Sequence, residues 1–544
     1  MKRALVAILV AACGGSPKPT TEDAGPPPAQ EKPTMTTPPP TPTTQTAQPQ
    51  DLKFPNEEFR AKQPEAGQLH AFSLPAMKPF SLPNGIAVYL VEQHTLPLVS
   101  MDLNFDGGSL TDPKGKEGLA SICTSMLTEG TEKLDKIQFS EALADVASSV
   151  NAYAADDSQG LGLASLTKHL PATFALFAET LRTPGLRQSD LDRMVKRRIE
   201  AVKQARGNPT AIPGRVSDAI LYGPTHPFGA ITTEQSLAAI TLADCKKQLA
   251  EWMQPKHARL FVVGDLTEQQ VRDTFAQSAL ADWKGAAPKL PALPAPATMA
   301  GRIFFVHVPN AAQSTVLLME HGPVRTAADY FPNTIMASVF GGSFTSRLNM
   351  NLREDKGYAY GARGGLSYSK HYGALTASAS VQTDATYQSL LEISREMTEL
   401  WAGKHPVTKD ELEREKLNAT LALPGKFATA QAALGQYRSL VYYGLPLDYF
   451  NTYADHVNQV TEAEVKKSAA AHLRPAPAVF LVVGDGDAKM IVDDPAQPKD
   501  KRRVPFLKNG TQVTLRQALE DLAAKGDVGS GGFVELDVDG HIVR

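Results

Sequence analysis

Residues Gly118–Thr131 read GLASICTSMLTEGT, a pattern that indicates a packed helix in the first half of the chain. Ser121, Thr124 and Ser125 lie three and four positions apart, so one face of this helix carries three alcohols. A hydroxyl stays protonated near neutral pH, which makes it a poor ligand for Zn²⁺ and prevents it from acting as a general base. We therefore expect an ordinary core helix with no role in metal binding.

The usual metal-binding residue types suggest no other site. The twelve histidines are scattered, and no two lie three or four residues apart, the spacing of a helical zinc pair. The three cysteines, Cys13, Cys123 and Cys245, are too few for a disulfide framework. Cys123 lies within the helix and has no histidine near it in the sequence, so we expect a free buried thiol rather than a nucleophile. Whether Cys245 is free stays open.

The composition is that of a soluble globular protein. The 544 residues are 42% hydrophobic and 21% charged, which suits two to four domains with ample core. The net charge is −3, so nothing favours a nucleic-acid partner.

The N-terminus has the pattern of an export signal. Two basic residues precede a short apolar run, Ala4–Ala12, which is about half the length that spans a bilayer. The run ends in VAACG, which resembles a bacterial lipobox and predicts that residues 1–13 are a lipoprotein signal peptide with Cys13 as the lipid-bearing residue. We expect an exported, periplasmic protein with a lipid anchor, and Gly14 favours the outer membrane. The alternative is a plain secretory signal with an incidental cysteine.

The next segments separate a tether from a folded domain. Residues 14–53 are rich in Pro, Thr and Gln and cannot bury enough apolar surface to fold, so we expect a disordered tether. Residues 54–283 form the first expected domain. Its apolar residues at 99, 101, 103 and 105 alternate with polar ones, the period of a strand with one buried face. Helices are predicted at 118–131, 136–147, 170–181, 188–206 and 241–253, and strands at 150–153, 160–166 and 258–263. Residues 80–91 are predicted to form a strand, an Asn84-Gly85 turn and a second strand.

A Pro- and Ala-rich stretch, 284–301, is typical of an interdomain linker, and the pattern restarts after it. Thr241, Lys246-Lys247, Pro255 and Val262–Asp265 recur as Thr461, Lys466-Lys467, Pro475 and Val482–Asp485. Each pair is separated by 220 positions (484 − 264, for example), which indicates an internal duplication. The second domain is expected over 302–492.

Strands come in hairpins and helices in runs, so the predicted class is α+β. We expect two duplicated α/β-sandwich domains, each a mixed sheet with helices packed on one face. Residues 493–544 are expected to be a C-terminal extension outside the duplication, and its basic run, Lys499–Arg503, is typical of a solvated surface.

Five motifs, together with the duplication, resemble the insulinase/pitrilysin family of zinc peptidases, specifically its short two-domain members and the mitochondrial processing peptidase subunits. The resemblance covers about Leu74 to Met490. The motifs are LPNGIAVYLVEQHTLPLVS, GGSLTDPKGKEGLA, SSVNAYAADDS, LYGPTHPFG and FGGSFTSRLNMNLREDKGYAYGA. The fold implied is that of the metallopeptidase domains.

The resemblance implies that the zinc chemistry is lost from this chain. Active members carry H-x-x-E-H on the first core helix, where two His bind Zn²⁺ and the Glu activates the bound water. The ligand positions correspond to Ser121 and Ser125, and the base corresponds to Thr124. The third ligand would fall near Glu200, where an ordinary surface Glu is the alternative. No metal is expected in this chain.

The second half keeps the substrate-binding signature of the family. An Arg and a Tyr seven residues later hold the substrate and stabilise the transition state in active members, and Arg353 and Tyr360 have that spacing. The alternative is that Arg353 makes a surface ion pair and Tyr360 is a core residue of a strand. Gly341 and Gly342 resemble the glycine-rich loop of the non-catalytic processing subunit, although a helix-ending turn is the alternative. Asn151-Ala152 matches the edge strand on which active members lay a peptide, or is an ordinary strand end.

Together these features predict a non-catalytic subunit of a zinc peptidase. Its partner would carry an intact H-x-x-E-H and the zinc, and peptides would be the substrate. The alternative is a structural or peptide-binding lipoprotein of the same fold with no proteolytic role.

Overall fold

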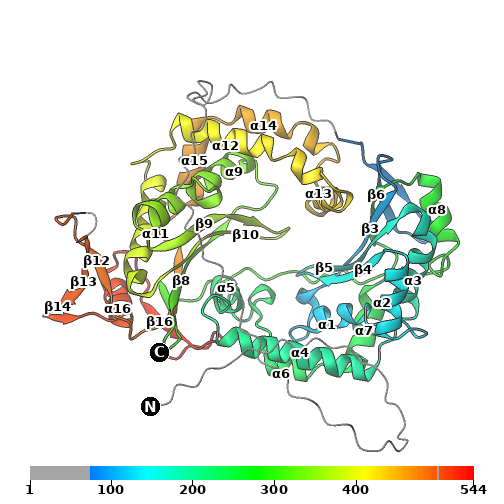
Figure 1. The fold of residues 1–544 in the computed structure, drawn as a ribbon, viewed down its shortest axis with the longest axis horizontal. Helices are drawn as coiled ribbons and strands as arrows, with labels where there is room; N and C mark the ends of the chain where they lie inside the picture. The colour runs from blue at the N-terminus through cyan, green and yellow to red at the C-terminus, as the bar shows by residue number, and fades with distance from the viewer. Residues whose placement is uncertain (1–73, 499–500) are drawn as a thin grey trace, which may run out of the picture. The chain divides into compact units, whose positions relative to one another are not determined.

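The computed structural model describes residues 74–498 and 501–544 (Figure 1). The signal peptide expected over 1–13, its Cys13, and the tether expected over 14–53 lie outside the described residues.

The first half is built on a mixed six-stranded sheet with the order β1-β2-β6-β3-β5-β4. β2 and β6 are parallel and the other neighbours are antiparallel. Asn84-Gly85 makes the turn between β1 and β2, where Gly85 has a φ of 92°, a conformation that glycine adopts without strain. The strands are β1 (Lys78–Ser81), β2 (Ala87–Glu92), β3 (Leu98–Asp106), β4 (Ser149–Ala154), β5 (Ser158–Leu166) and β6 (Arg259–Gly264).

Helices cover one face of this sheet and supply its core (Figure 1). The predicted helix at 188–206 has the bounds of α4, and the others agree to within a few residues. The helices are α1 (Leu119–Met126), α2 (Lys136–Asp145), α3 (Leu170–Arg182), α4 (Gln188–Arg206), α5 (Pro213–Tyr222), α6 (Glu234–Ala238), α7 (Leu242–Trp252) and α8 (Glu268–Ala276).

The second half repeats this plan with the sheet order β16-β7-β11-β8-β10-β9. β11 lies between β7 and β8 as β6 lies between β2 and β3, which is the structural counterpart of the sequence repeat. The edge strand β16 comes from residues 493–544, so this segment completes the second sheet. The sheet strands are β7 (Ile303–His307), β8 (Gln313–Gly322), β9 (Ala359–Tyr368), β10 (Gly373–Gln382), β11 (Val479–Gly484) and β16 (Phe533–Leu536).

The remaining elements complete the second half. Its helices are α9 (Tyr330–Ala337), α10 (Arg347–Asn349), α11 (Thr386–Trp401), α12 (Lys409–Leu421), α13 (Ala430–Tyr443), α14 (Tyr453–Gln459), α15 (Glu462–His472) and α16 (Leu515–Lys525), with two π-helical turns, η5 (Ser338–Gly342) and η6 (Met350–Asp355). Two short hairpins follow β11: β12 (Ile491–Asp493) with β13 (Arg503–Pro505), and β14 (Leu507–Lys508) with β15 (Thr511–Gln512). The predicted class, two duplicated α+β domains with helices on a mixed sheet, is confirmed.

One helix of each half packs on the sheet of the other half. α5 packs its apolar residues on β8 and β11, and α13, which lies 220 positions later in the repeat, packs on β3 and β6. This exchange corrects the expectation that β3 has one buried face. Ser100, Asp102 and Asn104 are only 5–6% exposed because α13 covers the side of β3 that local alternation assigns to solvent.

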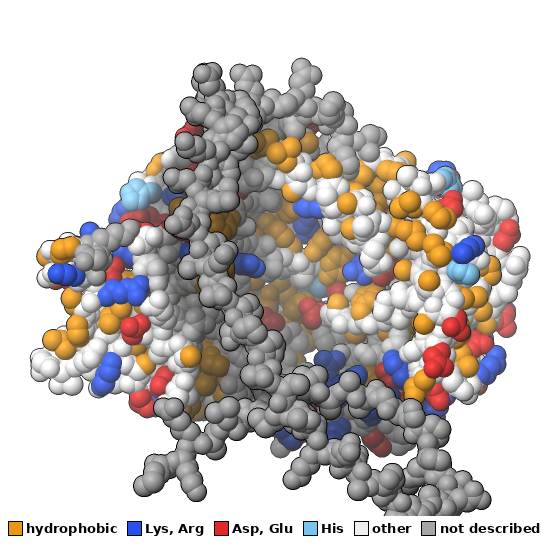
Figure 2. Space-filling view, in the orientation of Figure 1, with side chains coloured by type: hydrophobic (Ala, Val, Ile, Leu, Met, Phe, Trp, Pro, Cys, Tyr) orange, Lys and Arg blue, Asp and Glu red, His pale blue; other side chains and the backbone are white. Residues whose placement is uncertain are grey.

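No helix within the described residues is long and apolar enough to cross a bilayer. On the face drawn in Figure 2, Lys and Arg side chains are interspersed with Asp and Glu side chains. That distribution accords with the small net charge of −3.

Candidate functional site

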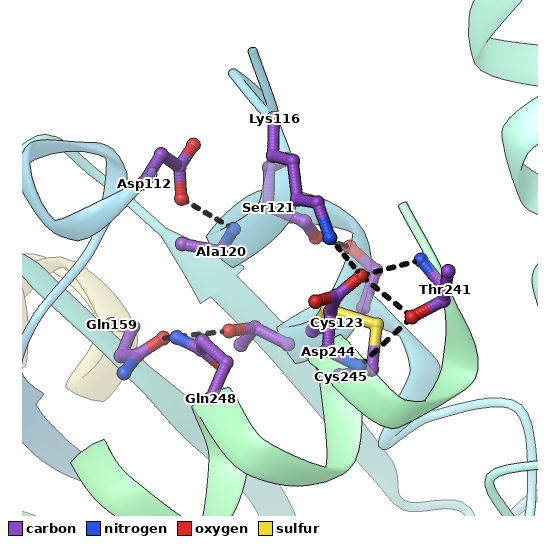
Figure 3. The surroundings of a disulfide bond; sticks show 12 residues. Asp112, Lys116, Ala120, Ser121, Cys123, Gln159, Thr241, Asp244, Cys245 and Gln248 are labelled. Carbon is purple, nitrogen blue, oxygen red and sulfur yellow. Dashed lines mark hydrogen bonds and ion pairs between the residues drawn. A yellow bond between two sulfur atoms is a disulfide. The ribbon is translucent and has the colours of Figure 1, made fainter. Parts of the chain in front are cut away.

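The first candidate region is α1, and its central alcohol is a buried structural group. Thr124 is fully buried and its Oγ1 donates to Oε1 of Gln159 at 2.9 Å. Gln248 Nε2 on α7 donates to the same oxygen at 2.7 Å (Figure 3). Thr124 therefore belongs to a hydrogen-bonded cluster between α1, β5 and α7.

The other two alcohols on this face of α1 are engaged as well. Ser125 Oγ donates to the carbonyl oxygen of Ser121 at 2.7 Å, one helical turn earlier. Ser121 Oγ accepts from Nη2 of Arg198, on α4, at 3.0 Å. A guanidinium, which remains charged in proteins, thus contacts one of the two positions expected to correspond to a zinc ligand.

These residues do not fit a divalent cation. Protonated alcohols are weak ligands for Zn²⁺, and the positive charge of Arg198 opposes a second cation beside it. Glu200, the carboxylate expected nearest the third ligand position, is 52% exposed and its Oε1 lies 3.0 Å from Nζ of Lys203. The described side chains of α1 and α4 therefore form a polar, cation-bearing surface instead of a metal centre.

Another cluster of potential ligands lies in the second half. Among the described residues, His307, Asp485 and Asp487 are the one group whose ligand atoms all lie within 4.8 Å of one another. Nδ1 of His307 accepts from the backbone N–H of Gly486 at 2.9 Å. This group stands at the ends of β7 and β11, away from α1.

A disulfide joins Cys123 of α1 to Cys245 of α7 (Figure 3). The expectation of a free buried thiol at Cys123 is therefore wrong. The two residues are 122 positions apart, so their pairing follows from the tertiary contact of α1 with α7 and has no local signal. A disulfide of this kind persists in an oxidising compartment.

A half-buried carboxylate, Asp112, holds the start of α1. The two oxygens of Asp112 accept from the backbone N–H groups of Gly118 and Ala120, each at 2.8 Å. Burial raises the pKa of Asp112 to about 6, and these hydrogen bonds oppose the rise. The N-terminus of α1, which has no side-chain cap of its own, is thus anchored by this carboxyl group.

The second candidate region is a groove of about 700 Å³ in the second half. Four residues singled out from the sequence line it: Arg353 on η6, Tyr360 on β9, and Gly341 and Gly342 on η5. The fold therefore brings together side chains and backbone that lie up to 19 positions apart (360 − 341).

Arg353 lies between two aromatic rings at the edge of this groove. Its Cζ is 4.7 Å from the ring centre of Phe344 and 5.2 Å from that of Tyr360, distances of cation–π contacts. Tyr360 is 88% exposed and Phe344 is 64% exposed, so both rings are open to solvent. The sequence analysis missed Phe344, although it stands two residues after Gly342 in the same motif.

The glycines have a packing reason for their presence. A Cβ on Gly341 would lie 2.3 Å from the backbone N of Gly364 on β9, so only glycine allows η5 to approach that strand. Ser338–Gly342 is a π-helical turn that continues α9. Gly341 and Gly342 end this turn and form one wall of the groove.

Asn151 and Ala152 lie on β4, the outer strand of the first sheet. They pair with Gly162 and Leu161 of β5 on one side only. They are in the other half of the chain and do not line the groove of Arg353 and Tyr360.

Comparison with known proteins places this fold in a family. Residues 87–221 match the family model described as insulinase (peptidase family M16), and residues 239–418 match the model described as peptidase M16 inactive domain. The chain is 23% identical over 407 residues to a Helicobacter pylori protein named non-peptidase homolog YmxG, an alignment that covers 74% of this chain and 92% of that one.

Solved structures share the architecture. The peptidase M16 inactive domain from Pseudomonas fluorescens superposes with a TM-score of 0.69 at 24% identity, over 75% of this chain and 98% of that one. The periplasmic protease PqqL from Escherichia coli superposes with a TM-score of 0.64 at 16% identity, over 78% of this chain and 47% of that one. The duplicated sheets, the motifs and both family models agree: the chain belongs to the insulinase family of peptidases, family M16.

Proposed function

We propose that this chain is the non-catalytic subunit of a zinc endopeptidase of the insulinase family. It would supply Arg353 and Tyr360 to a partner subunit that carries an intact H-x-x-E-H motif and the zinc. The observation that carries this proposal is the contrast between the two candidate regions. The hydroxyl groups of Thr124 and Ser125 on α1 donate hydrogen bonds within the protein, whereas the side chain of Tyr360 is 88% exposed at an open groove.

The groove residues suit the binding of a peptide undergoing hydrolysis. The hydroxyl of Tyr360 can donate a hydrogen bond to a carbonyl oxygen as negative charge develops on it. The guanidinium of Arg353 can donate in a fork to peptide carbonyls or to a carboxylate. Neither side chain activates water, so hydrolysis requires the partner. Asn151-Ala152 on the outer strand β4 would offer backbone groups to an extended peptide, while Gly341-Gly342 form one wall of the separate groove that holds Arg353 and Tyr360.

The disulfide supports an exported location for this subunit. Cys123 and Cys245 are joined within the core, as in proteins of oxidising compartments. The structural relative PqqL is described as periplasmic. We place this chain in the periplasm, with Cys13 as the lipid-bearing residue of an outer-membrane anchor.

The proposal is tested with the chain purified together with its zinc-bearing partner. Peptide hydrolysis by the pair should fall at least about tenfold in Tyr360→Phe, because a transition-state hydrogen bond is lost. Tyr89→Phe, on β2 and outside the groove, is the matched control and should leave hydrolysis unchanged. Equal activity of the Tyr360→Phe pair and the wild-type pair would favour the alternative, a structural or peptide-binding lipoprotein with no proteolytic role.

A further inference from the structure

A short turn sets the position of Arg353 relative to Tyr360. Lys356–Tyr358 connects η6, which carries Arg353, to β9, which carries Tyr360. Gly357 has a φ of 63°, in the left-handed region that favours glycine. Any displacement of this turn would therefore change how the two groove residues face each other.

Arg503, from the C-terminal segment, contacts this turn through both terminal nitrogens of its guanidinium. Nη2 donates to the carbonyl oxygens of Lys356 and Gly357, at 2.7 and 2.9 Å. Nη1 donates at 2.7 Å to the side chain of Gln382, which itself donates to the Gly357 carbonyl at 3.1 Å. The guanidinium also lies over the ring of Tyr358, 5.0 Å from its centre.

A second contact comes from the opposite strand of the same hairpin. Asp493 of β12 pairs in register with Arg503 of β13. Oδ2 of Asp493 lies 3.3 Å from Nζ of Lys356. The paired residues Asp493 and Arg503 thus contact the turn with an anionic and a cationic side chain. The basic run at Lys499–Arg503 was expected to be a solvated surface; its last member, Arg503, is exposed and in addition makes these directed contacts.

The hairpin is anchored to the core of the second half. Phe506, just after β13, packs against Tyr387 of α11 at 5.0 Å between ring centres. α16 buries Leu515, Leu519 and Leu522 in the same hydrophobic core as α11. The chain that follows Arg503 is therefore fixed to this core, which holds Arg503 beside the turn.

We propose that Arg503 is a positioning residue that fixes the turn between Arg353 and Tyr360, and that this is a role of the C-terminal segment 493–544. The inference deepens the proposed function and rests on it for its consequence in peptide hydrolysis. A fork of donors suits adjacent carbonyls, so a lysine at this position can replace only part of the contact. Small misplacements of groups that hold a substrate reduce the rate steeply.

Hydrogen exchange tests the clamp without any partner. In the full chain, Arg503→Ala should speed exchange of amides in 352–362 about tenfold, and Arg503→Lys should give an intermediate value. Arg502→Ala, the neighbouring residue of the same basic run, is the matched control. It should leave this segment unchanged, since Arg502 donates to Gln497 and not to the turn. Unchanged exchange in Arg503→Ala would overturn the proposal.

Kinetics of the complex separate a positioning role from a merely structural one. Arg503→Ala should lower kcat of the pair roughly tenfold with KM nearly unchanged, at an unaltered thermal midpoint. If Tyr360→Phe lowers hydrolysis but Arg503→Ala does not, the positioning role is wrong and the proposed function stands. If Tyr360→Phe has no effect while exchange responds to Arg503→Ala, the clamp stands and the proposed function is wrong.

Discussion

Arg198 Nη2 lies 3.0 Å from the hydroxyl of Ser121, so a permanent cation occupies the neighbourhood that the family's zinc would need. Insulinase-family activity depends on a metal held by the helix equivalent to α1. Here that helix instead joins a hydrogen-bonded cluster and a disulfide. In this chain, the positions predicted to correspond to the zinc ligands are engaged in other contacts.

Restoring the motif alone should not restore tight zinc binding. The triple substitution Ser121→His, Thr124→Glu and Ser125→His places the ligands beside Arg198, whose charge repels Zn²⁺. Adding Arg198→Ala should strengthen zinc affinity at least about tenfold, measured by calorimetric titration. Equal affinities for the triple and quadruple variants would show that Arg198 does not oppose the metal.

Removing the disulfide should destabilise the chain without unfolding it. Replacing Cys123 and Cys245 by Ala frees a loop of 122 residues in the unfolded state, which should reduce the free energy of unfolding by about 2–5 kcal/mol. Urea denaturation with and without reductant measures this effect. Reductant should lower the free energy of unfolding of the wild type and leave that of the double variant unchanged. If reductant lowered both, the stabilisation would not come from the Cys123–Cys245 disulfide.

The contact between the halves should depend on an ion pair between a buried carboxylate and a partly exposed guanidinium. Arg438 Nη1 on α13 lies 3.1 Å from Oδ2 of Asp102 on β3, and the Arg438 side chain is 39% exposed. Burial raises the pKa of the Asp102 carboxyl. Arg438→Met leaves this carboxyl group without its cation, and because solvent screens the pair the variant should cost about 1 kcal/mol in urea denaturation. The double variant with Asp102→Asn should cost less than the two single costs combined; simple additivity would contradict coupling across the halves.

Protonation of Asp112, at the start of α1, should raise the free energy of unfolding as the pH is lowered from 6 to 4. The folded-state pKa of Asp112 is about 6, above its ordinary value of 3.8, so between these values the folded chain binds more protons than the unfolded chain. The free energy of unfolding therefore falls as pH rises through this window, by at most about 1.4 kcal/mol per pH unit from this group. Asp112→Asn should flatten the slope between pH 4 and 6. An unchanged slope would mean that Asp112 titrates normally.

The sequence predicted what depends on local pattern and on repetition. Helix α4 has its predicted bounds because its apolar residues follow a helical period, and the offset of 220 positions revealed the two matching sheets. Four residues of the Arg353 groove were identified from one continuous motif, whereas Phe344 of the same motif was missed. Whether they bind peptide stays a prediction.

Contacts between segments that lie far apart in the chain could not be predicted from the sequence. Burial of Asp102 depends on α13, more than 300 residues later, and the partner of Cys123 is 122 positions away. The clamp by Arg503 depends on a hairpin that lies outside the repeat. Such pairings are set by tertiary packing, for which a single sequence carries no local signal.

The most direct test is the zinc content of the purified chain after dialysis against a weak chelator, measured by elemental analysis. The hydroxyl-lined face of α1 with Arg198 beside it predicts far less than one zinc per chain. One tightly bound zinc per chain, lost when Ser121 and Ser125 are both replaced by Ala, would contradict the division of labour proposed for this subunit.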